Sequence, residues 1–578
     1  MYISIQIIVN IISYLIFAIL GNIIGGLPIF IYILIGIIFF LNIKSLKDNF
    51  IYIKNHLLTN KLNTFIFILL SLYFEFSLFG SRLFTTVSFN ITYLFYLTLL
   101  FIPITILLMY IINIILKMDF TKPSKKYNLN VFTISFCIVF VISFLYLITY
   151  YPAISSPDTL DQFMQALELK PIFNWHTPFH TLIIRLCLSI FNHPSTVVIL
   201  QIILFSYVIA FASKTLKDIG INEKTCMVFS LIFILIPSNA ILINTLWKDV
   251  MYAACLLWLT VLITRYIFNL ESKSILFYIQ LSFSLSSIYL LRQNGIVPYI
   301  LSVIVLVVIA KFNKKIIITV LSSIVFILII IFPVYNFFNV QKEESYVGGA
   351  YIGLGQDIIG AKEYGGTLGE DAQYIYDELT NVEDYKYYPS YAKSSYSLDM
   401  KMSDFIFAYI DTFIKNPFTM TCAMLNRVDL MWGIPEGRDA IIGSVYYTGT
   451  MDENETWQQI APERIDIDFF LFNIIRQFVL ISKQPFLKLL FWRVGIFLFV
   501  SLITIFILIT KKQYKYICTF TPMIGQILAL LLSTGWADYR YFYSISLISM
   551  FLILALNKIF EKNQKKIKYN KKIIRNKK

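Results

Sequence analysis

The stretch "VFTISFCIVFVISFLYLITYY" at residues 131–151 decides the fold class, because it is a long and almost unbroken apolar run. A run of about 18 or more apolar residues predicts a transmembrane helix, since about 20 helical residues cross the hydrocarbon core of a bilayer. "IIITVLSSIVFILIIIFPVY" at residues 316–335 is a second such run. With 58% hydrophobic and only 14% charged residues, the chain is too apolar for a soluble protein of this length.

Similar runs recur along the whole chain and predict an all-α polytopic membrane protein with about 14 transmembrane helices. The predicted spans are 3–20, 24–42, 62–79, 91–116, 131–150, 194–212, 226–243, 250–268, 276–291, 296–310, 316–337, 488–510, 516–533 and 540–557. They divide the chain into an N-terminal addition of four helices (1–117), a membrane core (131–337), a large loop domain of mixed structure (338–486), C-terminal spans (487–557) and a basic tail (558–578).

The charges are distributed unevenly and predict the sidedness. Residues 338–486 hold 22 acidic and 11 basic residues, whereas the chain as a whole carries a net charge of +14. Basic loops face the cytoplasm in most membrane proteins. We therefore expect a cell-membrane protein with both termini in the cytoplasm and loop 338–486 outside. The basic loops 44–61, 117–126, 214–224, 311–315 and 511–515 should lie inside. Because the lysines sit in short loops and in the tail, topology explains them and no nucleic-acid partner is expected.

The segment "HTPFHTLIIRLCLSIF" at residues 176–191 tests this topology. If it crossed the membrane, the basic loops that follow would face outward. It is short for a span and carries two histidines and an arginine. We therefore expect residues 178–192 to form a helix on the outer surface, within an outer loop at 151–193.

Two acids in this outer loop, Asp158 and Asp161, are candidate catalytic residues. Three positions apart on a helix, they would share one face. A carboxylate beside a low-dielectric surface can act as a general base or bind a divalent cation. The alternative for Asp158 is a helix N-cap, since "SSPDTLDQ" at 155–162 has the composition of a helix start. Asp161 could equally be a solvated helix acid.

The same loop gathers two histidines, His176 and His180, four positions apart. No glutamate follows His176 in the zinc-protease pattern, and no third ligand lies nearby in the sequence, so a zinc site is not expected. Binding or protonating a phosphate fits the pair better. The alternative is that both histidines are polar anchors at the membrane interface.

Further polar residues occupy predicted outer span ends: Lys248, Asp249, Arg292, Asn294, Tyr539 and Arg540. Charges near the membrane plane are costly and usually mark a function. Arginine binds phosphate oxygens in a bidentate manner, so Arg292 and Arg540 with Lys248 predict an anionic ligand at the outer surface. The alternative for these cations is snorkelling to the headgroups.

Taken together, the motifs "SPDTLDQ", "WHTPFHTL", "LWKDV", "LRQNG" and "DYRYF" resemble the GT-C superfamily of membrane glycosyltransferases, in a bacterial branch. The resemblance covers roughly residues 131–557. It implies transfer of a sugar from a polyprenyl-phosphate carrier to a cell-envelope glycan, lipid or protein, with inversion, at the outer membrane face.

The resemblance also implies roles for individual residues. Asp158 corresponds to the acid that accepts the acceptor's proton, and His176 corresponds to a residue that contacts phosphate. Asp249 corresponds to a second acid that, with Asp158, holds a divalent cation such as Mg²⁺ or Mn²⁺ in some relatives. This chain has Lys-Asp there in place of a paired DxD, which departs from the family pattern.

Two other functions remain open. A surface-polysaccharide polymerase or ligase also carries a large outer loop, but typically relies on arginine and histidine without the early aspartate. A flippase or transporter for lipid-linked glycans usually shows internal repeats and polar residues at mid-membrane. No repeat is evident here, and the polar groups lie at span ends.

Overall fold

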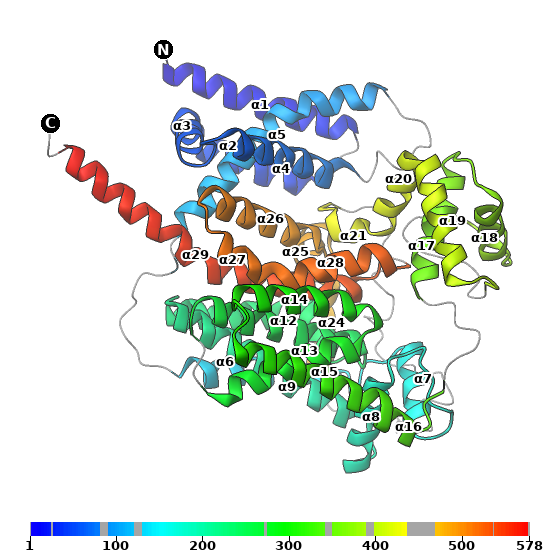
Figure 1. Ribbon diagram of the computed structural model, residues 1–578. Coiled ribbons are helices and arrows are strands. Elements are labelled where there is room, and N and C mark those ends of the chain that lie inside the picture. Colours follow the sequence, from blue (N-terminus) through cyan, green and yellow to red (C-terminus); the bar gives the residue numbers. More distant parts are fainter. Residues whose placement is uncertain are drawn as a thin grey trace.

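The computed structural model describes residues 2–24, 27–80, 91–118, 120, 130–270, 274–341, 349–388, 398–435, 469–535 and 537–575. Within these ranges the chain is helical and forms no strand beyond two isolated backbone bridges. Most helices run along one common direction, as expected for a bundle that spans a membrane (Figure 1). Lipid demands that backbone groups be satisfied within each segment, which favours helices over open strands.

The N-terminal helices form a layer on one side of the bundle (Figure 1). They are α1 (Tyr2–Ile24), α2 (Ile29–Leu41), α3 (Leu46–His56), α4 (Lys61–Phe79) and α5 (Ile91–Lys117). Helices α2 and α3 meet at 86°, so the basic segment of α3 turns away from the direction of its neighbour. The layer packs on α26 (Gly495–Thr510), where the rings of Phe74 and Phe499 stack at 4.1 Å.

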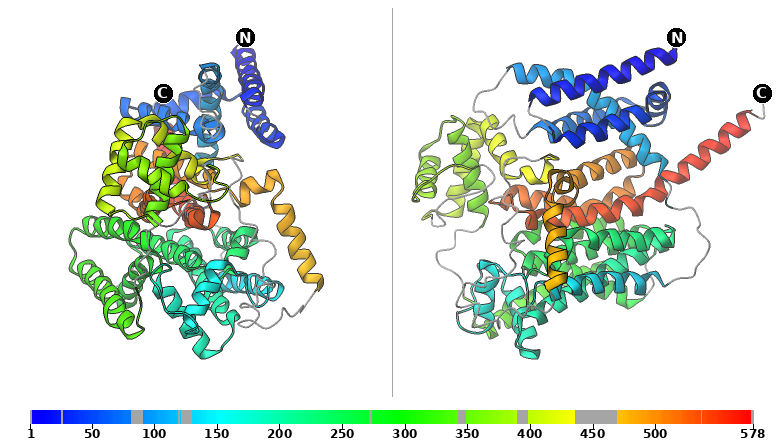
Figure 2. Two further views of the ribbon diagram at one scale, coloured as in Figure 1. Left: turned by 90° about the vertical axis from the view of Figure 1, so that its right-hand side faces the viewer. Right: turned by 180° about the vertical axis from the view of Figure 1, so that it is seen from behind.

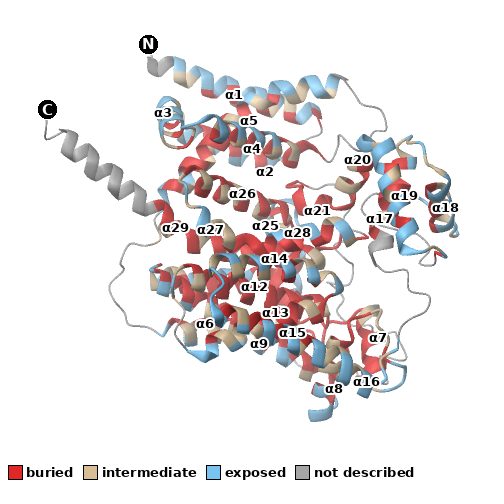
Figure 3. Cartoon of the chain, viewed as in Figure 1, coloured by how far each residue is buried: buried red, intermediate tan, exposed pale blue. Residues whose placement is uncertain are grey.

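The centre of the molecule is α12 (Lys248–Ile267), nearly all of whose residues are buried (Figure 3). Small residues such as Ala253 and Ala254 let neighbouring helices approach its backbone closely. The helices that pack directly on it are α9 (Pro194–Ile219), α13 (Ile275–Leu291), α27 (Tyr514–Ile517), α28 (Thr521–Ser533) and α29 (Tyr539–Arg575). Further out lie α6 (Val131–Thr149), α10 (Glu223–Leu235), α11 (Pro237–Ile243), α14 (Ile296–Ile309), α15 (Lys314–Ile329) and α25 (Pro485–Phe491).

The number of helices that could cross a membrane is lower than the sequence predicts. In the described residues nine helices are long and apolar enough, or twelve if each sharply bent pair forms one span. One bent pair is α10 and α11, which meet at 72° where Pro237 prevents the helix from continuing. Of the 14 predicted spans, those at α13 and α14 are only 17 and 14 residues long. A polytopic membrane protein is therefore supported, while the number 14 stays a prediction.

Three of the predicted basic loops lie at one end of the bundle, beside the C-terminal part of α29. Asn557 donates to the carbonyl of Met118 at 3.0 Å, and Lys558 binds the carbonyl of Ile219. Lys511 donates to the carbonyl of Phe560 at 3.2 Å. The loops near 118, 220 and 511 thus share this end, which we call the basic end; residues 121–129 lie outside the described part. Which side of the membrane it faces stays a prediction.

The loop 151–193 lies at the end opposite the basic end, with α7 (Pro157–Ala166) and α8 (Pro178–Ile190) (Figure 1). The Tyr151 hydroxyl lies 3.1 Å from His193 Nε2, so the loop starts and finishes at one place. The loop that contains α8 therefore leaves and re-enters the same end of the bundle, and whether α8 lies on the outer surface of a membrane stays a prediction. Its buried residues, such as Ile184 and Leu188, recur at helical spacing, while Leu186 and Ile190 are exposed.

The described part of the predicted loop domain is helical, so the expectation of mixed structure is not met there. Helices α17 (Gly349–Glu363), α18 (Glu370–Thr380), α19 (Met402–Lys415) and α20 (Pro417–Arg427) form a small bundle with its own core. This four-helix unit lies at the same end as α7 and α8 (Figure 1). It is followed by α21 (Asp429–Trp432) and, beyond the undescribed residues 436–468, by α24 (Phe469–Ser482), which runs crosswise to the bundle (Figure 2).

Candidate functional site

The helix that carries Asp158 begins two residues earlier than it would if Asp158 were its N-cap. Ser156 is the N-cap of α7: its hydroxyl accepts from the Thr159 backbone N–H, and Thr159 Oγ1 accepts in return from the Ser156 N–H. Pro157 occupies the first helical position. The alternative that Asp158 is the N-cap is therefore wrong, and its carboxylate is available for other contacts.

The start of α7 is attached to the segment that precedes α12. Ile154 N donates to the Asn244 carbonyl at 3.1 Å, and Leu246 N donates to the Ile154 carbonyl at 3.0 Å. The indole N–H of Trp247 donates to Ser156 Oγ at 2.5 Å. These contacts bring the segment that carries Asp158 and the "LWKDV" motif together at one end of the bundle.

Asp158 and Arg540 form an ion pair at the centre of the site. Arg540 donates from NH1 to Asp158 Oδ2 at 2.7 Å, and its Nε lies 3.2 Å from Asp538 Oδ2. The guanidinium also lies over the rings of Trp247, at 4.6 Å, and Tyr541, at 4.8 Å. Only 9% of the Arg540 side chain is accessible, against 39% for Asp158. Asp158 is therefore the member of this pair that a ligand would meet first.

The pKa of Asp158 reflects two opposing effects. Burial alone would raise it, but the positive charges of Arg540 and Lys248 outweigh this effect and hold the pKa of the carboxyl at about 2. Asp158 is thus ionised at neutral pH, and it is a weak base for as long as Arg540 stays paired with it.

A second ion pair, between Asp249 and Arg292, lies beside the first. Arg292 NH1 is 2.9 Å from Asp249 Oδ1, and both side chains are almost fully buried. The Arg292 guanidinium lies 4.6 Å from the centre of the Tyr541 ring, the same ring that Arg540 contacts. Tyr541 therefore links the two arginines.

The link from α13 to α14 holds Arg292 in place and requires a glycine. A Cβ on Gly295 would lie 1.9 Å from the carbonyl oxygen of Ile288, and 3.2 Å from the ring of Tyr252. No side chain fits in that space. Close packing beside the site therefore explains why the "LRQNG" motif has a glycine at this position.

The two histidines have separate partners, because His176 precedes the first turn of α8. His176 Nδ1 lies 3.0 Å from Lys248 Nζ, and His180 Nδ1 lies 3.1 Å from Gln162 Oε1. Burial, followed by the charge of Lys248, lowers the pKa of each histidine to about 3. Both imidazoles are neutral at neutral pH, so His176 accepts a hydrogen bond from the lysine. The expectation that the pair projects together toward a phosphate stays a prediction.

Asp161 lies at the edge of the site. Its carboxylate pairs with Lys170 at 3.1 Å, accepts from Gln165 at 2.6 Å, and is 3.7 Å from His176 Nε2. In this structure Asp161 orients its neighbours, and its predicted catalytic role stays a prediction.

Two of the predicted ligand-binding residues, Tyr539 and Asn294, have partners other than the two ion pairs described above. Tyr539 is fully buried, with its hydroxyl 3.3 Å from that of Ser238. Asn294 donates from its side chain to Ser533 Oγ at 2.8 Å. The tyrosine at the site is Tyr541, two positions along α29 and therefore on nearly the opposite face of the helix from Tyr539.

Sequence reasoning missed several residues that shape the site: Trp247, Tyr252, Tyr541, Gln162 and Gln165. A signal for the glutamines was present, because Asp158, Asp161, Gln162 and Gln165 recur at helical spacing in α7. They form a polar stripe on a helix whose other residues are largely apolar. The aromatic residues carried no comparable signal in a chain with 38 tyrosines and 7 tryptophans.

A divalent cation at Asp158 and Asp249 stays a prediction that the geometry does not favour. Each of these carboxylates is paired with an arginine. Among the described residues, no group of three or more histidine, cysteine, aspartate or glutamate side chains could hold a metal ion. The two carboxylates therefore suit their guanidinium partners better than they suit a divalent cation, which needs about six oxygen ligands.

Comparison with models of known protein families, with curated proteins and with solved structures finds no match to this chain.

Proposed function

We propose that the chain is a glycosyltransferase that moves a sugar from a polyprenyl-phosphate carrier to a cell-envelope acceptor, with inversion, at the extracytoplasmic face. One observation carries the proposal. Arg540, Arg292 and Lys248 gather at one end of the bundle beside the partly exposed carboxylate of Asp158. Buried charge of both signs at a membrane boundary is costly and is usually retained for function.

The cations suit the leaving group of such a reaction. The donor is a phosphodiester with one negative charge, and the departing polyprenyl phosphate gains a second. Two guanidiniums joined through Tyr541, together with a nearby ammonium, match this increase of charge. Because the positive charge is already in place, little reorganisation is needed as the bond breaks.

Asp158 is suited to accept the acceptor's proton once the phosphate has bound. A phosphate that takes over Arg540 would separate this arginine from Asp158, and the pKa of the carboxyl would rise toward its ordinary value. The acceptor oxygen then attacks the anomeric carbon and transfers its proton to Asp158. The bond from that carbon to the phosphate oxygen breaks, and the cations hold the leaving phosphate. A single displacement of this kind inverts the configuration.

The remaining side chains position these groups. His176 is neutral and accepts from Lys248, which directs the lysine toward the site. Asp249 balances Arg292. The cations of the chain itself supply the positive charge that the departing phosphate needs.

The test is a sugar analysis of the cell envelope from cells that lack the protein, rescued by wild type, Asp158→Asn or Asp218→Asn. Asp218 is a matched control, because it also pairs with an arginine, Arg265 at 2.7 Å, but at the basic end. We expect wild type and Asp218→Asn to restore a missing glycan substituent and Asp158→Asn to fail at normal protein level. Full rescue by Asp158→Asn would remove this residue from the mechanism and favour a polymerase, ligase or transporter.

A further inference from the structure

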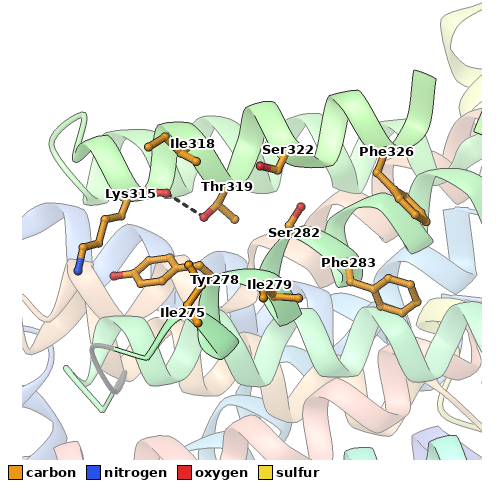
Figure 4. Close-up of a pocket in the computed structure, with 10 residues that line it drawn as sticks. All are labelled: Ile275, Tyr278, Ile279, Ser282, Phe283, Lys315, Ile318, Thr319, Ser322 and Phe326. Carbon is orange, nitrogen blue, oxygen red and sulfur yellow. Dashed lines mark hydrogen bonds between the residues drawn. The ribbon is translucent and has the colours of Figure 1, made fainter. Parts of the chain in front are cut away.

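A cavity of about 540 Å³ lies between α13 and α15, far from the site described above. Figure 4 shows the two helices facing each other, with Ser282 and Ser322 on opposite sides of the space. Apart from hydroxyl groups and Lys315 the lining is apolar, with Ile279 and Ile318 among its residues. Because these isoleucines are 57% and 50% exposed, the cavity is a groove that opens to the outside of the bundle.

The groove is closed at one end and charged at the other. The rings of Phe283 and Phe326 meet edge to face at 6.1 Å, and Ser286, about one turn after Phe283, donates to the Ser323 carbonyl. The opposite end carries Lys315, whose Nζ lies 5.6 Å from the ring centre of Tyr278 (Figure 4). An apolar slot with a cation at one end suits an amphiphile with a negative headgroup.

The length of the groove matches one leaflet of a bilayer. From Lys315 to Phe326 the helix rises about 16 Å, at ~1.5 Å per residue. Half of a hydrocarbon core of ~30 Å is about 15 Å. A chain that enters beside Lys315 would therefore reach the aromatic pair at about mid-membrane.

The charge around the mouth identifies the headgroup. Lys311, Lys314 and Lys315 all lie in or next to the short turn between α14 and α15. Basic pockets between transmembrane helices bind the headgroups of anionic lipids, and each lysine near the surface adds about 1 kcal/mol to the attraction.

We propose that the groove between α13 and α15 binds one acyl chain of an anionic diacyl lipid, with the lipid phosphate next to Lys315. This site is separate from the proposed transfer site and does not depend on the proposed function. It would hold a lipid at the periphery of the bundle, where α15 has few protein neighbours (Figure 2).

The test is native mass spectrometry of the purified full-length protein with phosphatidylglycerol or phosphatidylethanolamine as the probe. Two variants address the two halves of the site. Lys315→Met removes the charge but keeps the aliphatic stem, and Ser322→Phe fills the groove. Their controls are Lys224→Met, an exposed lysine outside the groove, and Ile304→Phe, an exposed position on α14.

We expect the wild type and both controls to retain phosphatidylglycerol more strongly than phosphatidylethanolamine. Lys315→Met should weaken phosphatidylglycerol binding about fivefold, as expected for the loss of one lysine. Ser322→Phe should abolish this site. Equal retention of the two lipids, or unchanged binding in Ser322→Phe, would overturn the proposal. Displacement of phosphatidylglycerol by a polyprenyl phosphate that is itself sensitive to Ser322→Phe would assign the groove to the carrier instead.

Discussion

Arg427 and Asp357 form a completely buried ion pair in which Arg427 Nε lies 2.7 Å from Asp357 Oδ1. Arg427 also donates to the carbonyl of Leu531 at 2.8 Å and to that of Thr534, at the end of α28. One residue thus joins the four-helix unit of α17–α20 to the segment that leads to Asp538 and Arg540. This connection explains how the unit is held at the same end of the bundle as the candidate site.

Replacing Arg427 with methionine should destabilise the protein severely, because it leaves the Asp357 carboxylate buried without its partner. Breaking a buried pair in this way costs about 3–5 kcal/mol. Thermal unfolding and limited proteolysis of the purified protein would measure the loss. Lys415→Met is the matched control, because its pair with Asp411 is about half exposed and is worth about 0–1 kcal/mol. Equal melting temperatures for the two variants would contradict this account.

Arg540→Lys should reduce sugar transfer by about 10²-fold or more, although the charge is retained. A lysine cannot bind Asp158 and a phosphate with the same fork of donors, nor lie over the Trp247 ring in the same way. The loss of one preorganised donor typically costs about 10²–10³ in rate. The assay is transfer from a polyprenyl-phosphate sugar to isolated envelope acceptor.

Arg265→Lys provides the control for this experiment. Arg265 also pairs with an aspartate, Asp218, but lies in the last turn of α12 at the basic end. We expect its transfer rate to stay within a few-fold of wild type. If Arg540→Lys retains the wild-type rate, the arginine is a structural partner of Asp158 and not a phosphate ligand.

The pH dependence of stability should depend on His180. This imidazole is fully buried and faces Gln162, Lys248, Asp249 and His176, and burial followed by Lys248 lowers its pKa to about 3. Between pH 6.5 and this value the unfolded chain binds a proton that the folded chain does not, so stability falls as the pH falls. The loss is about 2 kcal/mol at pH 5.

The melting temperature of His180→Gln should therefore fall less between pH 7.5 and pH 5 than that of wild type. His176 shifts in the same direction, so part of the dependence should remain. Asp158 does not contribute in this range, because the stability from its lowered pKa is lost only below about pH 3.8. His56→Gln, in α3, is the control. Parallel pH profiles for wild type and His180→Gln would refute the assignment.

The membrane fold and the grouping of the polar motifs could be predicted from the sequence, because both depend on local chemistry. Apolar runs require helices, and the placement of Asp158, Lys248, Arg292 and Arg540 at one end of the bundle followed from span order. The pairings could not be predicted: Asp158 and Arg540 are 382 residues apart. Nor does spacing show which face of α29 meets the two arginines: Tyr541 contacts both, and the ligand-binding role expected of Tyr539 stays a prediction.

The lengths of the helices and the points where they break could not be predicted from hydropathy, for a physical reason. Hydropathy registers an apolar run whether the helix is straight or broken, so α10 and α11 were predicted as one span at 226–243 despite their 72° bend. Pro237 was the available signal, since a helix usually ends before a proline. The basic loops were a better guide, because three of them do meet at one end of the bundle.

The sidedness of the two ends leads to the last prediction. In a variant with all six cysteines replaced, Glu378→Cys in α18 should react with a membrane-impermeant maleimide on intact cells. Lys224→Cys, at the start of α10 near the basic end, should react only after permeabilisation, because basic loops are retained in the cytoplasm. Both positions are exposed, so access of the reagent decides the outcome. The reverse labelling pattern would place Asp158 and Arg540 on the cytoplasmic face, and a donor sugar would then have to be used before its carrier is flipped.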